Sequence, residues 1–262
     1  MKTNKVPVVF AIAALMLSML ACNLGKATPG ATEVPQGNDT QANSTEAPAG
    51  NKSAAACGNP YIPIVVGATW NYNLTGAVPD TFTRSIVSIE AGGFTDQDVF
   101  GTGVTRQSKW TCDNGALTAL DPGGNTSNVS SENVQVDFQT TSASGVTLPA
   151  VLNPGDSWNQ AVTLEGTETI NGETLPAKNE FTNTCTVAGK ESITVAAGTF
   201  DAVRVDCNTN MAITITMNGS PISQPISFTA TSWYAEKVGL LKTVTAGNGL
   251  DSTVELTSYS IP

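Results

Sequence analysis

Five cysteines are the residues of this sequence whose positions say most about its chemistry: Cys22, Cys57, Cys112, Cys185 and Cys207. Their spacing contains no Cys-x-x-Cys pair, which argues against a cysteine-based zinc site. Histidine, the commonest general base and metal ligand near neutral pH, does not occur in the chain. Histidine-dependent catalytic triads and histidine-containing metal sites are therefore excluded.

Carboxylates are the remaining residues that could support catalysis. Glu165, Glu168 and Glu173 cluster around the dipeptide Asn171-Gly172. Glycoside hydrolysis needs two carboxylates about 5 to 9.5 Å apart. Nothing in this spacing fixes such a distance, so we expect solvated charges around a hairpin.

Two acidic segments carry oxygens that calcium could use, Asp96-Gln-Asp98 and Asp121-Pro-Gly-Gly-Asn125. Neither matches a defined calcium-binding loop, and we expect ordinary turn chemistry at both. The sequence also has no glycine-rich phosphate loop and no Gly-x-Ser-x-Gly elbow. We therefore expect a protein that is not an enzyme, without catalytic residues, bound metal or cofactor.

The N-terminus has the layout of an export signal. Lys2 and Lys5 precede the apolar stretch Val6–Leu20, and small Ala21 follows it. About 20 apolar residues are needed to span a bilayer, so this stretch is short for a transmembrane helix. Residues 1–21 are therefore predicted to be a signal peptide.

The segment Met19-Leu20-Ala21-Cys22 resembles the bacterial lipobox, in which a peptidase cuts before a cysteine modified with diacylglycerol. The resemblance implies a lipoprotein whose palmitate-type chains on Cys22 anchor it to the extracytoplasmic face of a bacterial membrane. Each buried methylene contributes about 0.8 kcal/mol, so two or more acyl chains would hold it durably. An ordinary secretory signal with an incidental Cys22 is the alternative.

Residues 22–56 are predicted to be the lipidated cysteine and a disordered linker. After Cys22 they include no aromatic residue, and Leu24 and Val34 are the only large apolar ones. Such a segment cannot bury enough apolar surface to offset its ordering entropy. The alternative is an N-terminal arm that docks on the folded domain.

Residues 57–262 are predicted to fold as one all-β domain. Period-2 alternation appears in Trp70-x-Tyr72-x-Leu74, in Val134-x-Val136-x-Phe138, and from Met211 through Ile213 and Ile215 to Met217, with Thr214 and Thr216 on the other face. The formal net charge of −10 makes nucleic-acid binding improbable. We expect an antiparallel meander that forms a curved sheet, half-barrel or open barrel.

Four Asn-Gly dipeptides support hairpins, because both central residues of a type I′ turn need positive φ. They lie at Asn114, Asn171, Asn218 and Asn248. A two-residue turn at Asn248-Gly249 predicts that Leu241 lies opposite Leu256 and Lys242 opposite Glu255.

The four cysteines after the linker allow three disulfide connectivities. Export places them in an oxidising compartment, where disulfides form. We favour Cys57–Cys112 and Cys185–Cys207, the first of which would join the start of the domain to the strand that ends at Cys112. If Cys185, Ser192–Val195 and Cys207 lay on three successive strands, the outer two would be about 10 Å apart, too far for a disulfide. Either the middle run leaves the sheet or this pairing is wrong.

Three motifs resemble the signatures of a family of bacterial lipoproteins known only by a domain of unknown function. They are Tyr61-x-Pro63-x-x-x-Gly67-x-x-Trp70-x-Tyr72, Gly198-Thr-Phe200-Asp-Ala202-x-x-Val205 and Trp233-Tyr-Ala235-x-x-Val238-Gly-Leu-Leu241-Lys242. The resemblance implies a curved, half-barrel-like β fold akin to periplasmic lipoprotein carriers. It implies no activity and no catalytic residue.

Two functions remain as the main expectations. The first is a non-enzymatic module that binds a lipid, glycan or other hydrophobic ligand on a curved sheet. The second is a structural or protein-interaction component of the cell envelope. An apolar cavity would favour the first, and a filled core with a flat polar sheet would favour the second.

Overall fold

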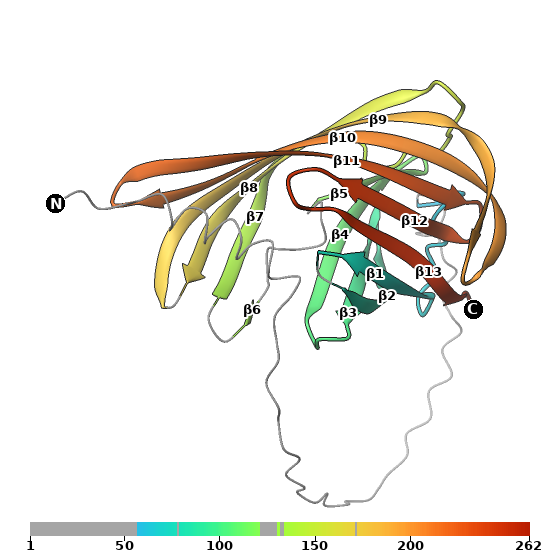
Figure 1. The fold of residues 1–262 in the computed structure, drawn as a ribbon, viewed down its shortest axis with the longest axis horizontal. Helices are drawn as coiled ribbons and strands as arrows, with labels where there is room; N and C mark the ends of the chain where they lie inside the picture. The colour runs from blue at the N-terminus through green and yellow to red at the C-terminus, as the bar shows by residue number, and fades with distance from the viewer. Residues whose placement is uncertain (1–56, 78, 121–129, 132–133, 171) are drawn as a thin grey trace, which may run out of the picture.

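A computed structural model describes residues 57–262 except 78, 121–129, 132–133 and 171 (Figure 1). The predicted signal peptide, the lipidation of Cys22 and the linker to residue 56 lie outside these residues, as does Asp121–Asn125. The domain division at residue 57 therefore stays a prediction.

The described residues form one antiparallel sheet of 13 strands and no helix, which confirms the predicted all-β meander. Accordingly, no helix in this part of the chain could cross a membrane. The strands are β1 Thr69–Gly76, β2 Asp80–Glu90, β3 Gly93–Phe100, β4 Thr105–Asp113, β5 Ala116–Ala119, β6 Ser130–Ser131, β7 Val134–Gly145, β8 Ser157–Ile170, β9 Glu173–Val195, β10 Gly198–Met217, β11 Ser220–Ala235, β12 Gly239–Ala246 and β13 Ser252–Ser260.

The sheet curls into a nearly closed barrel with one seam. The strand order is β5-β4-β3-β2-β1-β13-β12-β11-β10-β9-β8-β7-β6, so the seam lies between β5 and the β6–β7 edge. Leu117 and Leu148 exchange backbone hydrogen bonds across it, at 2.9 and 3.0 Å. The Gln160 side chain adds a further link by donating from Nε2 to the Ala119 carbonyl at 3.0 Å.

Strand length divides the sheet into two regions. Strands β1–β5, β12 and β13 are short, whereas β9 and β10 have 23 and 20 residues and extend well beyond them (Figure 1). Together with β7, β8 and β11, these long strands form a region that we call the long-strand wing. One end of the barrel is closed by the segment that precedes β1.

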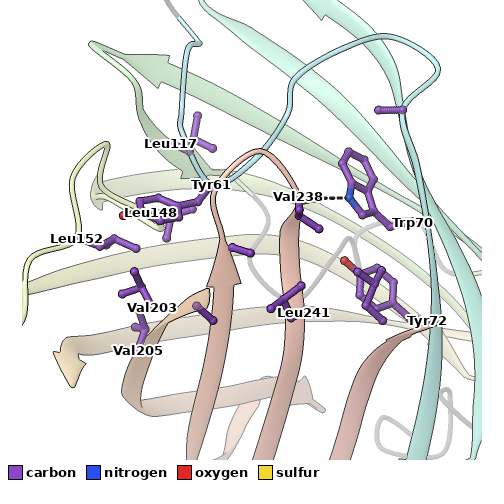
Figure 2. Packing of buried hydrophobic residues seen from close by; sticks show 14 of the residues in the cluster. Tyr61, Trp70, Tyr72, Leu117, Leu148, Leu152, Val203, Val205, Val238 and Leu241 are labelled. Atoms are coloured by element: carbon purple, nitrogen blue, oxygen red, sulfur yellow. Dashed lines mark hydrogen bonds between the residues drawn. The ribbon is translucent and has the colours of Figure 1, made fainter. Parts of the chain in front are cut away.

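The main core fills this closed end (Figure 2). The Trp70 indole N–H donates to the Val238 carbonyl at 2.5 Å, and the Tyr72 hydroxyl donates to the Leu240 carbonyl at 2.9 Å. Trp70, Tyr72 and Leu74 are all buried, which confirms the alternation predicted for this strand. The polar tips of the two aromatic side chains thus fasten β1 to the β11–β12 hairpin.

Three of the four Asn-Gly turns are confirmed. Both residues have positive φ at Asn114-Gly115, Asn218-Gly219 and Asn248-Gly249. Asn171 lies outside the described residues, but β8 and β9 pair up to Ile170 and Glu173 on either side of that turn.

The predicted register of the last hairpin is confirmed at Lys242, which pairs with Glu255. Their charged groups form an ion pair at 3.3 Å. Leu241 and Leu256, the next residues in line, are both fully buried in the main core.

The disulfides are Cys57–Cys112 and Cys185–Cys207, the favoured pairing of the three. Cys185 lies directly opposite Cys207 on the adjacent strands β9 and β10. The three-strand arrangement considered for this region is wrong, because Ser192–Val195 continues β9 past Cys185 without a turn. A register shift beside Gly189 lets the long strand bend and stay paired.

Candidate functional site

The inner face of the long-strand wing carries the most unusual titratable group. Glu168 of β8 is 1% exposed, so the expectation of a solvated charge is wrong for this residue. Glu165 and Glu173 are exposed, as expected. The difference follows from strand parity, because Glu168 points to the same side as buried Val162 and Leu164 whereas Glu165 points outward.

Apolar side chains surround Glu168. It lies opposite Leu175 on β9, and the neighbouring pair across these strands is Gly166 with Ala177. Ala177 in turn pairs with Ile215 of β10. The apolar side chains around Glu168 belong to a second hydrophobic cluster, separate from the main core. Its members are Phe138, Val162, Leu164, Leu175, Ala177 and Ile215, with Met217 packed against them.

Gly166 brings β7 close to this cluster. A Cβ at this position would overlap the Asp137 carbonyl oxygen and approach the Phe138 Cα atom to 2.8 Å. Glycine therefore allows the β7 backbone to pack against β8 beside Glu168. In the sheet register Phe138 of β7 lies opposite Gly166, and Leu175 of β9 lies opposite Glu168.

Glu168 has no compensating partner among the described residues. Its Oε1 atom is buried without a hydrogen bond, and no ion pair to it is found in this part of the chain. Burial raises the pKa of Glu168 to about 7, because the apolar surroundings penalise the charged form. A carboxyl group in this state can accept from a donor or bind a cation that reaches it.

Two further acceptors on the same face lack partners. They are Gln160 Oε1 and Asn179 Oδ1, and both residues are buried. Gln160 is eight residues from Glu168 on β8, about 26 Å along a strand without a bulge, and Asn179 lies opposite Leu164 between them. Buried acceptors without a donor are rare in proteins, and either a water molecule or a ligand can pair with them.

The substantial contacts of β7, β8 and β10 in the described chain are all with their neighbours in the sheet. The inner face of the wing therefore has no second layer of strands or helices in this part of the structure. This face thus combines a buried apolar cluster with the absence of a covering strand or helix among the described residues, which makes it the candidate surface for binding another molecule.

The Asp96 and Asp98 carboxylates occupy a different environment, and the expectation of turn chemistry there is wrong. Both lie within β3 and are buried on its inner face. Asp98 accepts hydrogen bonds from Arg84 of β2 at 2.8 and 2.9 Å and from Arg106 of β4 at 2.9 Å. Arg84 also lies 3.6 Å from Asp96.

Burial and the two arginines act in opposite directions on these aspartates. Burial alone would raise the pKa of Asp98, but Arg84 and Arg106 outweigh it and hold that pKa below its usual value. At Asp96 burial prevails over Arg84, and the neighbouring Asp98 charge adds to it, so the pKa is raised. Because two arginines balance two aspartates, this cluster is a structural ion network. No group of three or more potential metal ligands occurs among the described residues.

Two shallow hollows lie elsewhere on the sheet. One, of 350 Å³, is lined by Asn71, Thr83 and Val99 among others, and the second, of 340 Å³, by Asn159 and Thr184 among others. In each, a threonine hydroxyl donates to the asparagine Oδ1 atom, at 2.7 Å from Thr83 and 2.8 Å from Thr184. In each hollow these two side chains are hydrogen-bonded to each other. The inner face of the wing, where buried acceptors lack a partner, is therefore the stronger candidate for a ligand-binding site.

Sequence and structure comparisons place the fold in a known group. The chain belongs to the DUF3108-like family, whose model matches residues 97–259. This finding agrees with the resemblance to a lipoprotein family of unknown function. No curated protein is detectably similar to the chain in sequence.

Three solved structures are similar to the chain. A candidate lipoprotein from Parabacteroides distasonis shares 17% identity at a TM-score of 0.52, over 77% of this chain and 99% of that one. A candidate exported protein with a YmcC-like fold from Bacteroides fragilis shares 15% identity at 0.49, over 78% and 100%. The hypothetical lipoprotein YmcC from Escherichia coli shares 12% identity at 0.34, over 81% and 91%.

Strand parity could have identified Glu168 from the sequence. Gln160, Val162, Leu164, Gly166 and Glu168 alternate along one strand, and the two aliphatic residues mark that face as buried. No comparable signal exists for the pairing of Asp98 with two arginines from different strands.

Proposed function

We propose that this protein is an extracytoplasmic, lipid-anchored binding protein, not an enzyme, that holds a hydrophobic ligand on the inner face of its long-strand wing. The ligand class is a lipid or another molecule with a long apolar part. The single observation that carries the proposal is the second hydrophobic cluster, on a single-layer sheet, with unpartnered acceptors at Gln160, Asn179 and Glu168.

The anchoring part of the proposal rests on the N-terminal sequence. The apolar leader ends at Ala21, and Cys22 is the one cysteine outside the two disulfides. Two disulfides in a chain of this size are expected in an oxidising compartment.

Mass spectrometry of the mature N-terminus tests the anchor. A diacylated or triacylated Cys22 as first residue is the expected result. An unmodified Cys22, or cleavage at another position, would show that the protein is not anchored in this way.

Native mass spectrometry of the protein purified from its own host tests the ligand. We expect a co-purifying mass of lipid size that is released on unfolding. Substituting Leu164 by Asn, in the middle of the apolar cluster, should reduce its occupancy severalfold, whereas Thr163→Asn on the opposite face should not. Protein that carries no small molecule and binds none of a panel of lipids would instead support a structural or protein-interaction role in the cell envelope.

A further inference from the structure

This inference rests on the binding role proposed above, which does not specify the headgroup of the ligand. Glu168 is the residue of the inner face that bears on the choice of headgroup. Its carboxyl group is almost fully buried, and its Oε1 atom has no hydrogen bond. No arginine or lysine pairs with it in the described part of the chain, although Asp98, a similarly buried carboxylate, is held by two arginines. The wing therefore presents a buried carboxyl group that has no cationic partner among the described residues.

The surroundings of Glu168 are apolar on every side that the structure describes. Leu175 lies opposite it on β9, Gly166 and Leu164 precede it on its own face of β8, and Phe138 of β7 pairs with Gly166. Hydrocarbon groups thus extend from the carboxyl group toward the seam. Ionised carboxylates are costly to bury unless they are paired, so a ligand that brings its own cation would relieve this cost.

We propose that the inner face of the wing binds a single-chain amphiphile with a primary ammonium headgroup, its N–H donors on Glu168 and its hydrocarbon along Leu164 and Val162. Complementarity of charge supports this choice over the alternatives. A carboxylate or phosphate headgroup would face an acidic side chain with no neighbouring cation. An alcohol could donate one hydrogen bond but would leave the charge unbalanced.

Two further acceptors lie on the same inner face of β8 and β9 as Glu168. Gln160 and Asn179 offer carbonyl oxygens without donors, and neither adds positive charge. The described polar atoms that lack partners on this face are all acceptors, which suits a ligand rich in N–H or O–H groups. Glu168 is the charged member of this row, so we expect it to determine the preferred headgroup.

The test compares three probes of equal chain length on the full protein from its own host, by native mass spectrometry at pH 8. The probes are dodecylamine, dodecanol and dodecanoate. Charge-assisted hydrogen bonds are roughly twice as strong as neutral ones, so we expect dodecylamine to bind about tenfold more tightly than dodecanol, and dodecanoate to bind least.

Substitution of the carboxyl group provides the decisive comparison. In Glu168→Gln the preference for dodecylamine should disappear and dodecanoate should bind more tightly than before. Glu165→Gln, an exposed glutamate on the opposite face of the same strand, should keep the order seen in the unmodified protein. The probe series on the unmodified protein needs no variant, so the proposal remains testable if one of the variants fails to fold.

The outcomes separate this proposal from the function on which it rests. If all three probes bind equally, with and without Glu168→Gln, the ammonium preference is wrong while a hydrophobic binding face remains supported. If dodecanoate binds best to the unmodified protein, the headgroup assignment is again wrong. If no probe binds and no host lipid co-purifies, the binding function itself fails.

Discussion

Arg84 and Asp98 face each other on the adjacent strands β2 and β3, joined by Nε–Oδ1 and Nη2–Oδ2 hydrogen bonds of 2.8 and 2.9 Å. The same carboxylate also accepts from Arg106 on β4 at 2.9 Å. One buried aspartate therefore connects three neighbouring strands through their side chains. The Arg106 guanidinium also lies over the Phe100 ring, 4.6 Å from its centre.

Asp98→Asn should destabilise the protein strongly. The substitution leaves two guanidinium groups beside a single remaining carboxylate, and removing one partner of a buried ion pair costs about 3 to 5 kcal/mol. Urea unfolding followed by tryptophan fluorescence measures the loss. Asp201→Asn, at an exposed position of β10, should change the free energy of unfolding by less than about 0.5 kcal/mol. A loss below about 1 kcal/mol for Asp98→Asn would show that the network contributes little.

Glu168 should make stability fall as the pH rises toward neutrality. Its pKa is about 7 in the folded protein, above the value of about 4.3 for an unfolded chain, so the folded state binds more protons between these values. Stability from this group is complete below about pH 4 and is lost as the pH rises through about 7, a change of about 3 to 4 kcal/mol.

Urea unfolding at pH 5 and pH 8 measures this effect. Glu168→Gln should remove the part of this pH dependence that comes from Glu168, and Glu165→Gln should retain it, while Asp96, whose pKa is also raised, adds a change of the same sign in every variant. If the unmodified protein and Glu168→Gln show the same change between the two pH values, the buried carboxyl group is not its source. Asp98 contributes with the opposite sign, because its lowered pKa favours the folded state above the unfolded pKa and loses that effect as the pH falls.

The two disulfides should differ in their contribution to stability. The Cys57–Cys112 bond closes a separation of 55 residues and Cys185–Cys207 one of 22. By chain entropy, replacing the first pair by serine should cost about 4 kcal/mol and replacing the second about 3 kcal/mol.

Thermal and urea unfolding of the two double-serine variants measures this difference. The cost for Cys57 and Cys112 should be the greater, since this bond also fixes the segment that closes the barrel. Equal or reversed costs would show that loop length does not control the effect.

Trp70→Phe should be costly although both side chains are aromatic. The indole N–H donates to the Val238 carbonyl inside the main core, and phenylalanine would leave that carbonyl unpaired and the space partly empty. We expect a loss of about 2 to 4 kcal/mol.

Trp233→Phe is the matched control, because its indole N–H donates to Glu191 in an exposed position. That substitution should cost about 1 kcal/mol or less. Urea unfolding of the two variants gives the comparison, and similar losses would mean that the hydrogen bond from Trp70 to Val238 adds little.

Local sequence patterns predicted most of the fold. The alternation of Trp70, Tyr72 and Leu74 identified a half-buried strand, because successive side chains of a strand point to opposite faces. Asn248-Gly249 identified a hairpin and its register, because a two-residue turn with positive φ leaves one way to pair the flanking strands. Both features depend on residues close together in the chain.

The candidate site was predicted less well. All three glutamates around residue 171 were predicted to be solvated, yet Glu168 is buried, on the face of β8 that strand parity shares with Val162 and Leu164. Asp96 and Asp98 were predicted to be turn residues. The arginines that hold Asp98 lie on neighbouring strands, 8 to 14 residues away, and no local pattern reveals them.

The sequence by itself determined an all-β chain with its turns, because these depend on residue type and short spacing, and it led to a favoured disulfide pairing and to the prediction that Cys22 is lipidated. Tertiary structure alone decided that β9 continues past Cys185, that the sheet closes at the Leu117–Leu148 seam, and which carboxyl groups are buried with partners and which without. The physical reason is that burial and charge pairing depend on the curvature of the whole sheet, which brings together faces of strands that are distant in sequence.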